Sequence, residues 1–155
     1  MVAALALLGT ACEPPPKPPL QLTITLDQSA TYDVLTKAVA LRATVTCTRP
    51  AKVYLTEADL VVPGSGPVVL TTRSLDPYTS ANAAPVDCPG PGGGTGTSWW
   101  HWTGEAPDTG GYTIWLSGST FGLLGPSYAT AQGAGTVHFS KVLCWFGLSS
   151  PCAPA

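Results

Sequence analysis

The chain has 155 residues, a formal net charge of -2 and only 10% charged residues, so it lacks the basic face that nucleic-acid binding requires. Hydrophobic residues make up 45% of the chain, which excludes general disorder, yet no apolar run reaches the roughly 20 residues of a membrane-spanning helix. The 17 glycines and 16 prolines, together with few good helix formers, favour one all-β domain.

The N-terminal segment is typical of an export signal. Residues 1–11 hold a short apolar run followed by small residues, as a signal peptide does. The stretch LLGTAC resembles the lipobox of bacterial lipoproteins, in which the cysteine after the cut receives lipid, here Cys12. We expect a signal peptide whose start lies upstream, because no basic residue precedes the apolar run, and lipid on Cys12. The alternatives are a plain secretory leader that removes Cys12, and a disulfide at Cys12.

A proline-rich spacer follows this leader. Residues 12–19, CEPPPKPP, should adopt the extended polyproline II conformation and act as a semi-rigid tether. Such a tether would hold a folded domain, residues 20–155, away from a membrane surface.

The other four cysteines predict a disulfide framework. In an oxidising compartment they can pair in three ways. We favour Cys47 with Cys88, which ties a strand to a proline-glycine loop, and Cys144 with Cys152, which closes a short C-terminal disulfide loop. No CxxC pair occurs and neither histidine stands at ligand spacing from a cysteine, so we expect no metal and no cofactor.

Alternating apolar and polar residues predict a series of short strands. Segments with this alternation, or rich in β-branched and aromatic residues, are 20–26, 38–48, 52–62, 68–74, 98–102, 106–118 and 136–144. The turn sequence PGSGP joins the third and fourth of them as a hairpin. Because glycine and proline turns separate the strands and no amphipathic helix occurs, the pattern favours an antiparallel β-sandwich.

Two patterns resemble the immunoglobulin fold. Asp108, Gly110 and Tyr112 follow the order D-x-G-x-Y, in which the tyrosine of immunoglobulin domains bonds back to the backbone. The order of ATVTCTRPAKVYL, VDCPG, a tryptophan strand and LLGPSYATAQG is similar to small exported bacterial immunoglobulin-like domains, over residues 20–142. The resemblance implies an immunoglobulin-like β-sandwich in which the first two of the four cysteines are bridged, and it implies no chemistry.

The stretch SWWHW at residues 98–102 is the most unusual in the chain. Alternate residues of a strand face opposite sides, so one aromatic pair should be buried and the other exposed. Exposed rings two residues apart can stack on sugar rings or on the apolar surface of a partner. The candidate ligand-binding residues are therefore Trp99, Trp100, His101 and Trp102. The alternative is that both pairs serve packing.

Catalytic patterns are weak. No G-x-S-x-G elbow occurs, and GPGGGTG lacks the lysine and the helix of a phosphate loop. A histidine with Asp108, or two carboxylates among Glu57, Asp59 and Glu105, would be a chance pairing among 2 histidines and 9 acids. We expect that the protein is not an enzyme and that no residue is catalytic.

Together these observations predict an exported binding module at the cell surface or in the envelope, anchored to the membrane only through lipid. Its partner would be a protein or a glycan, and not nucleic acid. An alternative is a structural subunit of an envelope assembly or fibre, joined through edge strands. A third is a secreted enzyme inhibitor.

Overall fold

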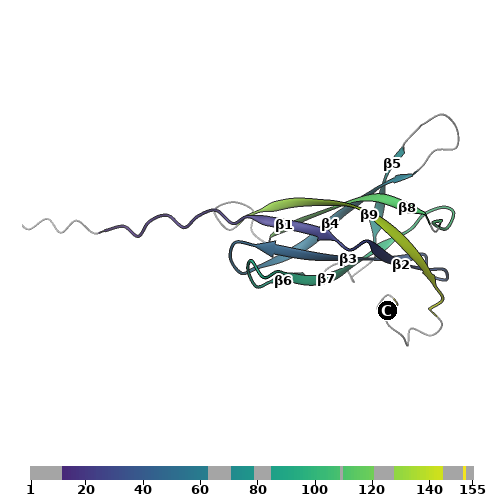
Figure 1. Cartoon of the computed structure of the whole chain (residues 1–155), viewed down its shortest axis with the longest axis horizontal. Helices are drawn as coiled ribbons and strands as arrows, with labels where there is room; N and C mark the ends of the chain where they lie inside the picture. The colour runs from purple at the N-terminus through teal and green to yellow at the C-terminus, as the bar shows by residue number, and fades with distance from the viewer. Residues whose placement is uncertain are drawn as a thin grey trace, which may run out of the picture.

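The computed structural model describes residues 12–62, 71–78, 85–108, 110–120, 128–144 and 152 (Figure 1). Its strands are β1 (Leu22–Leu26), β2 (Ser29–Asp33), β3 (Ala38–Cys47), β4 (Ala51–Val62), β5 (Thr71–Pro77), β6 (Val86–Cys88), β7 (Gly94–His101), β8 (Gly111–Thr120) and β9 (Thr130–Val142). The all-β prediction is confirmed, and these described residues contain no helix able to span a membrane. The predicted signal peptide, residues 1–11, lies outside the described residues.

Seven strands close into a barrel. β3 pairs with β2, β2 with β9, β9 with β8, β8 with β4, β4 with β5, β5 with β7, and β7 returns to β3. The prediction of an immunoglobulin-like sandwich is therefore wrong, because a sandwich consists of two separate sheets whereas this sheet closes on itself. The short strands β1 and β6 lie outside the ring and pair with β3 and β4.

β3 is long enough to pair with three strands, which allows the sheet to close into a barrel. One edge of β3 pairs with β7 over eight residues, from Ala38 to Val45. Its other edge is shared by β2 near the start and by β1 near the end. β2 then joins β9 in parallel, so the ring is not purely antiparallel. Alternation along one strand shows which face is buried, but it does not show which strand lies beside it.

Two disulfides add to the apolar packing, one of them inside the core and one at the C-terminal end. Cys47–Cys88 is buried and joins β3 to β6, with the two Cα atoms 6.3 Å apart. Closing a loop of 41 residues in this way stabilises the fold by about 4 kcal/mol through the unfolded state. Cys144–Cys152 closes the short C-terminal loop, with its Cα atoms 5.7 Å apart. Both predicted disulfide bonds are present, while Cys12 is free and exposed.

An aromatic cluster fills one region of the core around Trp102. The rings of Tyr32, Tyr112 and Phe139 meet it edge to face, with centroids 5.4 to 6.3 Å from the Trp102 centroid. The Tyr112 hydroxyl accepts a hydrogen bond of 2.9 Å from the backbone N–H of Asp108. The backbone contact that the D-x-G-x-Y pattern predicts is thus formed, although the surrounding fold is a barrel.

Gly133 lets β9 pass very close to β1. A Cβ atom at Gly133 would lie 2.3 Å from the carbonyl oxygen of Ile24, which is far inside van der Waals contact with backbone. A Cβ at Gly135, two residues along the same strand, would lie 3.7 Å from the Cβ of Leu26, an ordinary contact. The two glycines therefore form a matched pair for substitution.

We predict that Gly133→Ala lowers the free energy of unfolding by about 2 kcal/mol, because β1 and β9 must separate to admit the methyl group. Gly135→Ala should change it by less than about 0.5 kcal/mol. Urea unfolding of the two variants beside the parent chain measures both values. Equal effects at the two positions would contradict the close packing of β1 against β9.

Candidate functional site

The tryptophan-rich stretch lies at the end of β7, where it divides into a buried and an outward-facing pair. Trp100 and Trp102 are buried, with 0% and 3% of their surface exposed. The indole N–H of Trp100 donates to the Ser98 hydroxyl at 2.9 Å, and that of Trp102 donates to the Glu105 carbonyl at 2.6 Å. Both N–H groups are satisfied inside the protein, so Trp100 and Trp102 belong to the core and leave the candidate ligand-binding set.

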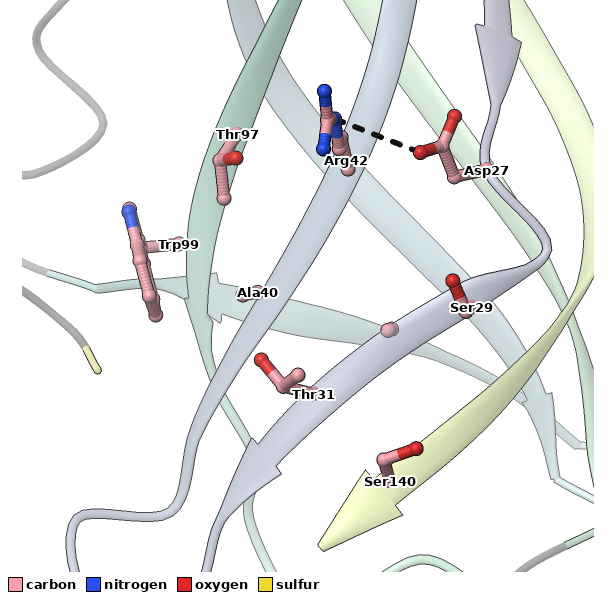
Figure 2. Close-up of a pocket in the computed structure, with 9 residues that line it drawn as sticks. Asp27, Ser29, Thr31, Ala40, Arg42, Thr97, Trp99 and Ser140 are labelled. Atoms are coloured by element: carbon pink, nitrogen blue, oxygen red, sulfur yellow. Dashed lines mark ion pairs between the residues drawn. The ribbon is translucent and has the colours of Figure 1, made fainter. Parts of the chain in front are cut away.

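The other pair faces outward. Trp99 and His101 are both half-buried on the outer surface of the barrel. The His101 ring stacks on Tyr78, with centroids 6.2 Å apart and planes 24° apart. Trp99 instead lies on the wall of a surface groove of about 350 Å³ (Figure 2). The two residues therefore have different surroundings, and only Trp99 borders this groove.

Four strands supply the lining of the groove. They contribute Ser29, Ala30 and Thr31 from β2, Ala40 and Arg42 from β3, Thr97 and Trp99 from β7, and Ser140 from β9. Asp27 joins them from the connection between β1 and β2. Four of the nine lining side chains, those of Ser29, Thr31, Thr97 and Ser140, carry a hydroxyl group, which can both donate and accept a hydrogen bond. The groove thus combines polar groups with apolar surface from Ala30, Ala40 and the large ring of Trp99.

Strand register sets the width of the groove. Ser140 stands opposite Thr31, Thr31 opposite Ala40, and Ala40 opposite Trp99. These four residues form one row across the barrel surface, with neighbouring strands about 4.8 Å apart. Because the third position is only a methyl group, the space between Thr31 and the indole stays open. Figure 2 shows the indole of Trp99 edge-on, with a ring face turned toward Ala40 and Thr31.

An ion pair between Asp27 and Arg42 lies at the upper end of the groove in Figure 2. The Nε of Arg42 is 3.7 Å from the Oδ2 of Asp27, and the side chains are 63% and 41% exposed. The backbone N–H of Asp27 donates to the carbonyl of Arg42 at 2.9 Å, which fixes the two residues side by side. An exposed ion pair at this separation contributes little stability by itself. Both charged groups can therefore turn toward a ligand at small cost.

Asp33 fixes the end of β2, the strand that carries Ser29 and Thr31. It is buried, and its carboxylate accepts hydrogen bonds from the N–H groups of Leu35 and Cys144, and from the N–H and hydroxyl of Thr36. Burial raises the pKa of this carboxyl, but the hydrogen bonds from Thr36, Leu35 and Cys144 outweigh it and leave the pKa below its ordinary value of 3.8. Asp33 therefore joins the end of β2 to the segment after β9 as an ionised group.

Other residues weighed for chemistry lie apart from the groove. His138 faces outward from β9 opposite Gly111, and Asp59 accepts a hydrogen bond from the Ser74 hydroxyl. Across the described part of the chain, no three His, Cys, Asp or Glu side chains gather where they could hold a metal ion.

Most of the groove residues are not apparent from the sequence. They are Asp27, Ser29, Thr31, Arg42, Thr97 and Ser140. Each is an ordinary polar residue at an outward position of a strand, or beside one. The sequence indicated only the outward-facing side chains of the tryptophan strand as candidates. The residues beside them could be identified only once β3 was known to pair with β7.

We predict that Asp33→Asn lowers the free energy of unfolding by about 2 kcal/mol near neutral pH, because charge-assisted hydrogen bonds become neutral ones. A carboxyl whose pKa is lowered by folding adds stability above its ordinary value of 3.8, and that stability is lost as the pH falls through the lowered pKa. The gap between parent and variant should therefore shrink as the pH falls from about 5 toward about 2.

Urea unfolding across this pH series measures the effect, with Asp76→Asn as the control at an exposed aspartate of β5. The control should stay within about 0.5 kcal/mol of the parent throughout. A constant gap for Asp33→Asn at every pH would contradict an ionised Asp33.

Comparison with known proteins adds no relative. No protein-family model matches the chain, and no curated protein matches it. The function must therefore be argued from the groove and from the covalent framework of the chain itself.

Proposed function

We propose that the protein is an exported binding module of the cell surface and that the groove beside Trp99 is its ligand site. The observation that carries this proposal is the position of Trp99, a large aromatic ring held on the outer surface beside a hollow lined with hydroxyl groups. Large rigid rings give contact area with little loss of rotamer entropy, which makes them frequent anchors at binding surfaces.

Export is supported by the covalent framework. The chain has two disulfides. Disulfide bonds form and persist in oxidising compartments and are rare in the cytosol. Residues 12–19 are exposed throughout and run away from the barrel as an extended segment (Figure 1). In the polyproline II conformation, these residues would span about 25 Å. A lipid on the exposed Cys12 would then leave the groove clear of the membrane surface.

The closed sheet weighs against the alternative of assembly through edge strands. Such assembly needs a row of unpaired backbone groups at the edge of a sheet. Here the pairings of β3 with β7 and of β2 with β9 use backbone groups that an open sheet would leave free, which leaves the short strands β1 and β6, each paired along one side, as edges. The groove therefore supports binding through side chains better than assembly through strand edges.

The proposal predicts that Trp99→Ala reduces binding of the full mature protein to cells of its native host by at least about tenfold, since the main contact surface is removed. The control is Trp115→Ala, which removes a half-buried outward tryptophan of β8 that does not line the groove. Labelled protein and intact cells give the affinities, and thermal unfolding checks that both variants fold. Undiminished binding by folded Trp99→Ala would refute the groove as the site.

A further inference from the structure

We infer that the ligand of the groove is a saccharide, whose ring stacks on Trp99 and whose neighbouring hydroxyl groups bind Asp27 and Arg42. This inference rests on the proposed function and names the class of ligand.

The indole supplies the contact for the apolar side of a sugar. A pyranose has flat faces made of C–H groups, which carry partial positive charge and favour the negative face of an aromatic ring. Trp99 turns a ring face along the row toward Ala40 and Thr31. The methyl group of Ala40, which is itself 8% exposed, forms a low floor beside the indole. A flat ring can therefore lie against the indole without meeting a larger side chain from β3.

The ion pair supplies the polar contact. Each sugar hydroxyl is both a donor and an acceptor, so two adjacent hydroxyls fit a carboxylate that accepts and a guanidinium that donates. Asp27 and Arg42 offer these groups 3.7 Å apart, close enough to meet two neighbouring hydroxyls of one ring. Their backbone hydrogen bond sets the two residues side by side, so a ligand needs only to orient their exposed side chains.

The remaining lining fits the other hydroxyls of a sugar. Ser29, Thr31, Thr97 and Ser140 are short, and each can donate or accept. With one acid and one base, the groove carries no net charge among its lining residues. Its volume of about 350 Å³ lies within the range of small-molecule sites, roughly 300 to 1,000 Å³.

Other classes of ligand fit less well. A phosphate-rich ligand would need several cations, and Arg42 is the only one on the lining. A lipid chain would need an apolar tunnel, whereas this open groove carries four hydroxyl groups and an ion pair on its lining. A peptide strand would need an open backbone edge, but β3 and β7 pair with each other beneath the groove. A saccharide is the ligand whose chemistry matches both the ring and the polar groups.

The test is a titration of the full mature protein with methyl glucoside, methyl mannoside and soluble polysaccharides of known composition, followed by NMR. The indole N–H signal of Trp99 should shift on binding, while that of the buried Trp100 should stay in place. Trp99→Ala should weaken binding at least tenfold, and Trp99→Phe, which keeps an aromatic ring, should stay within about fivefold of the parent. Trp115→Ala is the matched control.

A second set of measurements tests the contact between Asp27 and two adjacent sugar hydroxyls, a diol. Asp27→Ala and a deoxy sugar lacking one of the two hydroxyls should each weaken binding at least fivefold, and together they should cost little more than either alone, because they remove the same contact. Fully additive losses would overturn the pairing of Asp27 with that diol.

The outcomes separate the inference from the proposed function. If no saccharide shifts the Trp99 signal while Trp99→Ala still abolishes binding to cells, the saccharide inference falls and the binding module stands. If neither saccharide nor cell binding responds to Trp99→Ala, both fall.

Discussion

The pairing of β7, β3, β2 and β9 side by side is the constraint on which the rest of the structure depends. It closes the barrel, and its register places Trp99, Ala40, Thr31 and Ser140 in one row on the outer surface. Side chains alternate between the two faces of a strand. A slip of one residue between β3 and β7 would therefore turn Trp99 from the outer surface toward the core. Barrel closure and the groove are therefore consequences of the same set of hydrogen bonds.

The two neighbouring tryptophans illustrate how strongly this register is enforced. Trp100 is fully buried and its N–H reaches Ser98, whose hydroxyl in turn donates to the carbonyl of Leu41 on β3. Exposing this side chain would cost the burial of a large ring and break that buried chain of hydrogen bonds. The core thereby fixes the outward direction of Trp99, so the wall of the groove needs no separate stabilisation of its own.

The sequence predicted local features well and the connections between strands poorly. The alternation at 39–47, the disulfide from Cys47 to Cys88 and the backbone contact of Tyr112 could be predicted because each depends on neighbours in the chain or on few candidates. The closed barrel was missed because the contact between β2 and β9 joins residues more than 100 positions apart. The groove was missed for the same reason, since Ser140 joins Asp27 on its lining only after that contact forms.

Backbone nuclear Overhauser effects in the isotope-labelled protein test these strand pairings most directly. We predict cross-strand contacts between Ala40 and Trp99 and between Thr31 and Ser140, with the Trp99 side chain partly accessible to solvent and that of Trp100 protected. Contacts that place Ala40 opposite Trp100, or no contact between β2 and β9, would contradict both the closed barrel and the groove that it forms.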